Sequence, residues 1–76
     1  MNYDYIYADA YLEVMSSHYL KNDPVLRRIR KSIIKTVVQR EDDEGKPYVC
    51  IWVEGDSFYF RGTMEEFDKA CKTVYI

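Results

Sequence analysis

The chain has little of what catalytic and metal sites are usually built from. Among its 76 residues are one histidine, two cysteines, three glycines and two prolines. The patterns GxGxxG, GxxxxGK[ST], HExxH and CxxC, which hold phosphates, zinc or redox-active thiols, do not occur. His18 follows Ser16 and Ser17, but a catalytic triad is assembled in space and not along the sequence. We therefore expect no enzymatic activity, no cofactor and no metal site.

Long hydrophobic runs are missing as well. No apolar stretch approaches the roughly 18 residues that a membrane-spanning helix needs. The opening segment MNYDYIYADA contains no basic residue and includes Asp4 and Asp9, which is unlike a secretory signal. These absences predict a cytoplasmic protein without a membrane partner. In a reducing compartment Cys50 and Cys71 are expected to be free thiols.

What the chain does contain is typical of one small folded domain spanning residues 1–76. Hydrophobic residues make up 47% and charged residues 32%, a balance that argues against disorder. Aromatic residues reach 16%, with eight tyrosines. Because a tyrosine ring can be buried while its hydroxyl stays in water, this residue suits both core edges and binding surfaces.

A first helix is predicted over residues 4–20. Apolar residues recur there at spacings of three and four, which is the period of one helix face. They are Tyr5, Ala8, Leu12, Met15 and Tyr19. The alternation of residues 3–7 also suits a strand, and this is the alternative for the start of the chain.

A second helix is predicted over residues 24–31, because Asp23 is a good N-cap and Pro24 favours the first helical position. Its inward residues would be Leu26 and Ile29. From residue 32 onward β-branched residues dominate, which favours a strand over 32–40. A helix that continues to Arg40 is the alternative, since it would keep the apolar period.

Two further strands and a last helix complete the predicted fold. Residues 47–54 form the most apolar strand, and Gly55-Asp56 predicts a tight turn into a strand over 57–61. Residues 63–66 read TMEE, a capping box that would begin a helix over 64–73. The expected fold class is α+β in the order ααβββα, a three-stranded antiparallel meander packed by helices.

The predicted turn assigns residues to the two faces of the meander. The inner face would carry Val49, Ile51, Val53, Phe58 and Phe60. The first strand would add Ile34, Thr36 and Val38 to it, or, as the alternative, Ile33, Lys35 and Val37. The outer face would carry Tyr48, Trp52 and Tyr59, with Lys35 and Arg61 at the rim. An exposed aromatic patch is unusual on a monomer, so we predict that these residues bind another protein. The alternative is that the first helix covers this face.

The charges of the chain are unevenly distributed. Residues 24–40 carry six positive charges and no acid, and both flanking segments are acidic. Four of these cations lie close together: Arg27, Arg28, Arg30 and Lys31. Such a cluster would neutralise phosphates, so the alternative hypothesis is a small nucleic-acid-binding regulator that uses the basic segment 27–40. The four consecutive acids 41–44 would repel a phosphate backbone and favour a protein partner.

Together these features predict a non-enzymatic protein-binding module. A compact, tyrosine-rich domain with acidic ends is similar in style to the anti-CRISPR-like inhibitors that phages encode against host defence systems. That similarity implies an inhibitor of a host protein, encoded by a phage or another mobile element, although no residue motif carries it. A homodimer formed through the exposed sheet is a third hypothesis.

Overall fold

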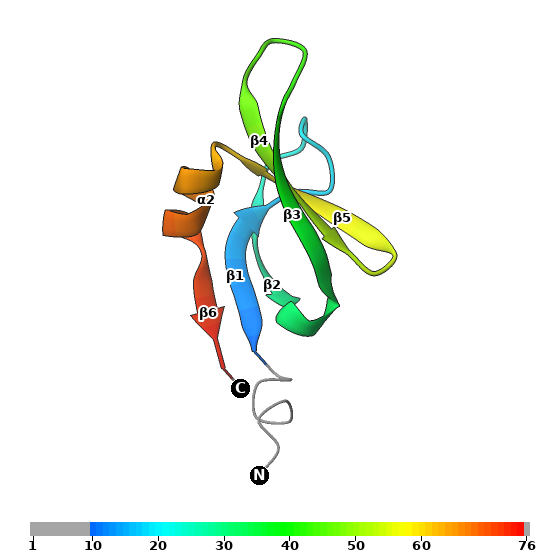
Figure 1. The fold of residues 1–76 in the computed structure, drawn as a ribbon, viewed down its shortest axis with the longest axis vertical. Helices are drawn as coiled ribbons and strands as arrows, with labels where there is room; N and C mark the ends of the chain where they lie inside the picture. Colours follow the sequence, from blue (N-terminus) through cyan, green and yellow to red (C-terminus); the bar gives the residue numbers. More distant parts are fainter. Residues whose placement is uncertain (1–9, 76) are drawn as a thin grey trace.

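The computed structural model describes residues 10–75, which form a mostly β structure with one short α-helix (Figure 1). Two three-stranded antiparallel sheets make up the fold, with strand orders β2-β1-β6 and β3-β4-β5. We call them the β1 sheet and the meander sheet. The predicted α+β class and the predicted order ααβββα are therefore wrong.

Strand β1 (Tyr11–Ser16) occupies part of the segment where the sequence predicts the first helix. Its side chains alternate, and Val14 on the inward side is only 1% exposed. Strands β2 and β6 pair with β1 on its two edges, so an extended chain satisfies its backbone hydrogen bonds on both sides. The helix prediction is wrong over residues 11–20. Its first part, like the alternative strand at 3–7, lies outside the described residues.

Strand β2 (Val25–Arg30) replaces the second predicted helix. It pairs with β1 so that Leu12 faces Ile29 and Met15 faces Leu26. Ile29 is 3% exposed, but Leu26 is 64% exposed, so the two do not share the inward face expected of a helix. The Asp23-Pro24 pair ends a loop directly before β2. Proline is tolerated where a strand begins.

The meander sheet follows after a short 3-10 helix, η1 (Lys31–Ile33). Its strands are β3 (Ile34–Glu41), β4 (Pro47–Val53) and β5 (Asp56–Arg61), paired in the antiparallel order that the sequence predicts. The first of them begins two residues later than predicted, and the alternative of a helix continued to Arg40 is wrong. This is the part of the predicted architecture that the structure retains.

The turn between β4 and β5 is shifted by one position from the prediction. Glu54 and Gly55 form it, so Val53 pairs with Asp56 and not with Phe58. Gly55 has φ +74°, close to the value of about +80° that the third position of a type II turn requires. Each residue of β4 therefore pairs with a residue of β5 two positions earlier than predicted. Because side chains on a strand alternate with a period of two, a shift of two positions does not change the face on which they lie. Each residue of β4 and β5 therefore keeps its predicted face.

The faces of β3 are partly reversed. The register shifts between Ile34 and Thr36, which leaves Lys35 at a β-bulge. Beyond the bulge Val37 pairs with a buried residue of β4 on the inner face, while Thr36 and Val38 lie on the outer face. The inward prediction is confirmed for Ile34, which pairs with a buried residue of β4, and wrong for Thr36 and Val38.

Helix α2 (Met64–Ala70) connects the meander sheet to β6 (Lys72–Val74). Its predicted capping box is confirmed: the Glu66 amide donates to the Thr63 hydroxyl at 3.1 Å, and the Thr63 amide donates to the Glu66 carboxylate at 2.9 Å. The helix ends at Ala70 and not at residue 73, because the chain then extends to pair with β1.

The hydrophobic core lies between the inner faces of the two sheets and beneath α2. Its buried members are Val14, Ile29, Val49, Ile51, Val53 and Phe67. Phe67 of α2 meets Phe60 of β5 edge-on, with ring centroids 5.3 Å apart. Both cysteines are free thiols. Across residues 10–75, no helix is long and apolar enough to cross a membrane.

Candidate functional site

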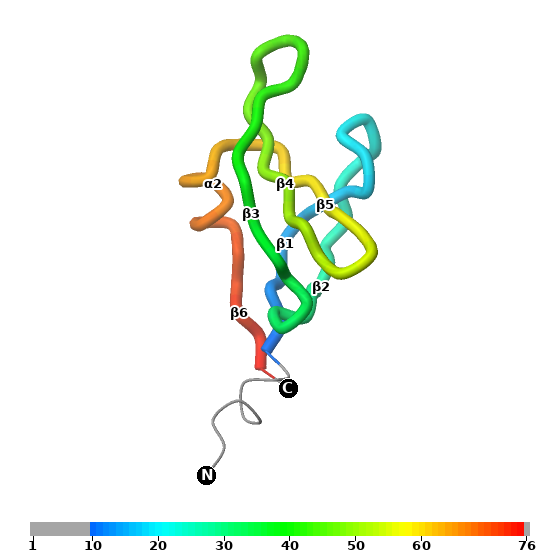
Figure 2. Tube along the Cα trace, turned by 45° about the vertical axis from the view of Figure 1, so that its right-hand side comes forward, coloured from blue at the N-terminus to red at the C-terminus, as the bar shows by residue number. Residues whose placement is uncertain are grey.

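The loop between β1 and β2, residues 17–24, runs beside the meander sheet (Figure 2). Its first residue, Ser17, exchanges two backbone hydrogen bonds with Tyr59 of β5: Ser17 donates at 3.0 Å and Tyr59 donates back at 2.8 Å. This bridge joins the β1 sheet to the edge of the meander sheet. It places the loop next to the side chains on the outer face of β4 and β5.

A groove of about 500 Å³ opens where the loop meets the sheet. Its lining residues are Tyr19, Leu20, Lys21 and Asn22 of the loop, Tyr48 of β4 and Tyr59 of β5. The Tyr48 and Tyr59 rings meet edge to face, with centroids 5.7 Å apart and planes at 68°. Its volume is in the range of sites that bind small ligands. We call this site the tyrosine groove.

The structure brings together some of the predicted contact residues but not all of them. Tyr48 and Tyr59 line the tyrosine groove together. Trp52 is on the same sheet face and 42% exposed, but it lies nearer the β4–β5 turn and does not line the groove. Lys35 is exposed at the bulge of β3, and Arg61 is bound to the β3–β4 turn.

The contribution of the loop is what sequence reasoning missed. Tyr19 is 69% exposed and lies beside the sheet. The predicted helix over residues 4–20 places it on a helix face instead. A signal was present, since Asn22, Asp23 and Pro24 form a cluster typical of loops and turns. With a loop at this point, the residues before the cluster become candidates for a surface site.

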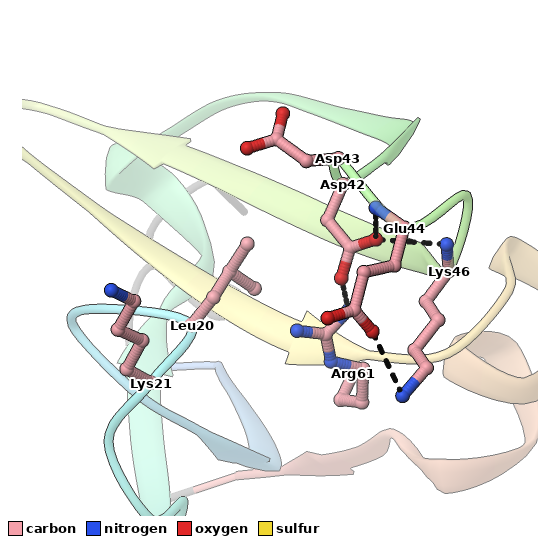
Figure 3. A pocket seen from close by; sticks show the side chains of 7 residues that line it. All are labelled: Leu20, Lys21, Asp42, Asp43, Glu44, Lys46 and Arg61. Carbon is pink, nitrogen blue, oxygen red and sulfur yellow. Dashed lines mark hydrogen bonds and ion pairs between the residues drawn. The ribbon is translucent and has the colours of Figure 1, made fainter.

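A second hollow, of about 540 Å³, adjoins the tyrosine groove and shares Leu20 and Lys21 with it (Figure 3). Its opposite side is the acidic turn between β3 and β4, residues 42–46. Gly45 in this turn has φ +78°, a left-handed conformation that glycine adopts without strain. Backbone hydrogen bonds between Asp42 and Lys46 and between Gly45 and Asp42 close this turn.

Asp42 organises this turn. Its carboxylate accepts hydrogen bonds from the amides of Glu44 and Lys46, each at 2.9 Å, and from the Arg61 guanidinium at 2.9 Å. The hydrogen bond from the Lys46 amide is the largest cause that lowers the pKa of Asp42, and the Arg61 guanidinium lowers this pKa further. Arg61 thus holds the turn against β5 and is not an unpaired rim cation.

Strand alternation divides the predicted basic cluster between the two sides of β2. Arg28 donates to Glu13 at 2.8 Å, and Arg30 donates to the Tyr11 hydroxyl at 3.0 Å. Arg27 lies on the opposite side of the strand, and Lys31 belongs to η1. The contiguous array of four cations that a helix would present to phosphates does not form. Arg28 and Arg30 instead form hydrogen bonds with side chains of the neighbouring strand β1.

Arg27 connects β2 with the loop and with β5. Its Nε donates to the Ser16 hydroxyl at 3.2 Å, its Nη1 lies 3.3 Å from His18 Nε2, and its guanidinium stacks 4.7 Å from the centre of the Phe58 ring. His18 Nδ1 lies 3.7 Å from the Asp56 carboxylate. Serine, histidine and aspartate thus come close, but the imidazole faces arginine and Ser16 is fully buried. This geometry does not activate a serine nucleophile, which needs a hydrogen-bonded histidine base.

Within residues 10–75, no three histidine, cysteine, aspartate or glutamate side chains come together as metal ligands would. Burial raises the pKa of the Cys50 thiol, and burial followed by the charge of Asp68 raises that of Cys71 to about 11. Both raised pKa values favour the protonated thiol, which reacts more slowly than the thiolate.

Comparison with known proteins finds no matching family model, and neither the curated proteins nor the solved structures yield a match.

Proposed function

We propose that this protein is a non-enzymatic protein-binding module whose contact site is the tyrosine groove. The observation that supports this is that two separate parts of the chain, the loop 17–24 and the β4–β5 hairpin, contribute tyrosines to one open groove. Tyr19 exposes 69% of its surface there, although a tyrosine ring is large and mostly apolar. Tyrosine and tryptophan are enriched among the residues that dominate binding energy in protein interfaces.

A protein partner would cover more than the groove. A stable interface buries about 800 Å² on each partner, which would extend along β4 from Tyr48 to Trp52. The proposed contact set is therefore Tyr19, Leu20, Tyr48, Trp52 and Tyr59. The composition favours one version of this function. The protein would be encoded by a phage or another mobile element and would inhibit a host protein in the cytoplasm.

The two competing partners are less well supported. For nucleic acid, the arginines of β2 are engaged within the β1 sheet, and the acidic turn stands beside the groove. A homodimer through the exposed sheet is supported by no separate contact within residues 10–75, and the concentration dependence of the mass tests it below.

The experiment is affinity capture from a lysate of host cells, with nuclease added to every sample. Wild type is compared with Tyr19→Ala and with Tyr75→Ala, a matched control because Tyr75 is 63% exposed and outside the groove lining. We expect a discrete protein band that Tyr19→Ala weakens and Tyr75→Ala leaves unchanged. A band that is equal in both variants, or that nuclease removes, would contradict the proposal. A mass that doubles with concentration would assign the groove to a second copy.

A further inference from the structure

The two edges of the meander sheet differ in what covers them. At the β5 edge the chain itself adds a backbone segment, since Ser17 exchanges two hydrogen bonds with Tyr59. The other edge is β3, which pairs with β4 alone. The outer strands of the β1 sheet are shorter, with six residues in β2 and three in β6 against eight in β3. Among residues 10–75, β3 therefore offers the longest open edge.

The hydrogen bonds at the β3–β4 turn show which backbone groups of β3 face the open side. The Asp42 amide donates to the Lys46 carbonyl at 2.9 Å, and in an antiparallel pair every second residue bonds to the neighbouring strand. The residues that direct their backbone groups away from β4 are therefore Val37, Gln39 and Glu41. Pro47, the partner of Glu41, has no N–H, which suits a position without a bond between the strands. Within residues 10–75, no hydrogen bond reaches these three residues from the open side.

Backbone donors and acceptors at every second residue specify one kind of ligand. Along a strand they recur about 7 Å apart, which is twice the rise per residue. An extended peptide presents its own N–H and C=O groups at the same spacing, whereas a phosphate group offers only acceptors. Addition of a strand to an open sheet edge is a general mode of peptide recognition, in which main-chain hydrogen bonds supply affinity and side chains supply specificity. The open edge therefore favours an extended peptide over nucleic acid.

The side chains of β3 set the charge and the register of such a peptide. Arg40 and Glu41 are exposed, and neither has an ion pair within residues 10–75. Residues directly opposite each other on adjacent strands stabilise the pairing when their charges are opposite. An acid is therefore expected opposite Arg40 and a base opposite Glu41. Val37 and Val38 are half-buried and suit apolar partners, and the bulge at Lys35 ends the regular pairing.

We propose that the open edge of β3 binds an extended segment of a partner protein as an antiparallel fourth strand of the meander sheet. Antiparallel pairing is slightly more stable per residue than parallel pairing. From its N-terminus the segment reads base, acid, any residue, apolar, apolar, and these lie opposite Glu41 to Val37 in turn. The site uses none of the residues that line the tyrosine groove, so it goes beyond the proposed function and does not depend on it.

The test titrates the full chain with four synthetic peptides. The matched peptide has lysine, glutamate, threonine, valine and valine at its centre, and the second peptide exchanges the lysine and the glutamate. The third carries an N-methyl group on the threonine, whose N–H bonds to β3 in the proposed pairing. The fourth carries it on the glutamate, whose N–H points away from β3. Calorimetry measures the affinities, and the shifts of backbone amide NMR signals locate the site.

We expect the matched peptide to bind most tightly and to shift the amides of residues 37–41. N-methylation of the threonine should weaken it about tenfold, because a hydrogen bond between the strands is lost. N-methylation of the glutamate is the matched control and should change the affinity less than about twofold. A chain with both Arg40→Glu and Glu41→Arg should prefer the charge-exchanged peptide instead. Both side chains are exposed, so these substitutions should not disturb the fold.

Several outcomes would overturn the inference. They are equal binding of the two charge arrangements, equal effects of the two N-methyl groups, and amide shifts at β2 or the tyrosine groove and not at β3. If concentrating the protein without peptide shifts the amides of residues 37–41, a second copy occupies the edge and the inference is also wrong.

The inference and the proposed function fail separately. If protein capture depends on Tyr19 but no peptide binds at β3, the inference is wrong and the proposed function stands. If the matched peptide binds at β3 but Tyr19→Ala leaves capture unchanged, the inference stands and the proposed function is wrong.

Discussion

The two sheets of this protein are stabilised by different kinds of contact. In the meander sheet, the central strand β4 has Val49 and Ile51 fully buried on one face and Cys50 only 1% exposed on the other. The β1 sheet buries fewer apolar residues, chiefly Val14 and Ile29, and its edge strand β2 is fastened by arginine side chains. Hydrophobic burial thus concentrates in the meander sheet, and side-chain hydrogen bonds from arginines hold β2 to β1 within the other sheet.

This difference explains where the tyrosine groove lies. One wall is on the meander sheet, which is the most deeply buried part of the fold, and the other is the loop 17–24 of the β1 sheet. Segments with few buried apolar contacts open more easily than the core, and binding loops are commonly drawn from them. The groove thus combines a well-packed wall with a loop that has few buried apolar contacts.

The largest effect is expected at Ile51, which has no exposed surface. Ile51→Ala should lower the free energy of unfolding by about 2–5 kcal/mol, because it removes buried methyl groups and leaves a cavity. Urea denaturation followed by circular dichroism measures this loss. Leu26→Ala, at a 64% exposed site in β2, is the control and should stay within about 0.5 kcal/mol. If both variants lost similar free energy of unfolding, the two sheets would not differ in how much buried side chains stabilise them.

A smaller loss is expected at Arg27. Arg27→Ala should cost about 1–3 kcal/mol, since the buried Ser16 hydroxyl loses its donor and the Phe58 ring loses the guanidinium above it. Arg28→Ala removes only an exposed ion pair with Glu13 and should cost less than about 1 kcal/mol. The same denaturation assay compares them. If Arg28→Ala proved the more damaging, the attachment of the loop would not run through Arg27.

A pH-dependent effect is expected at Asp42. Its pKa in the folded state lies below the ordinary value of 3.8, so ionised Asp42 stabilises the fold above that value and this contribution is lost as the pH falls below it. Wild type should therefore lose more stability than Asp42→Asn on acidification from pH 3.8 downward. Urea midpoints across this range test it. Asp43→Asn should follow wild type, because Asp43 has no ion pair within residues 10–75.

The mildest test compares the two thiols by their reactivity. Both should react slowly with a thiol reagent near neutral pH in the folded protein, and Cys71 should become faster as the pH approaches 11. Cys50, on the central strand of the meander sheet, is 1% exposed and should react more slowly than the half-buried Cys71. Mass spectrometry of the alkylated protein gives both rates. Faster modification of Cys50 would show that the meander sheet opens before the β1 sheet.

Local sequence signals are sufficient to predict the meander and the helix that follows it. The β-branched run of β3, the apolar run of β4 and the glycine in the turn are local signals, and so is the capping box at Thr63. The faces of β4 and β5 were predictable despite the wrong turn position, because an error of two residues in the pairing leaves the alternation unchanged. Two of the six residues that line the tyrosine groove, Tyr48 and Tyr59, follow from these signals.

In the first third of the described chain, tertiary contacts and not local signals select strands over helices. Residues 11–16 fit the spacing of a helix face and the alternation of a strand equally well, and Arg27 to Arg30 resemble a solvated helix face. What selects strands is their pairing with each other and with β6 near the far end of the chain, a contact that no local pattern encodes. The same pairing turns residues 17–24 into a loop and brings Tyr19 to the sheet tyrosines, which completes the groove.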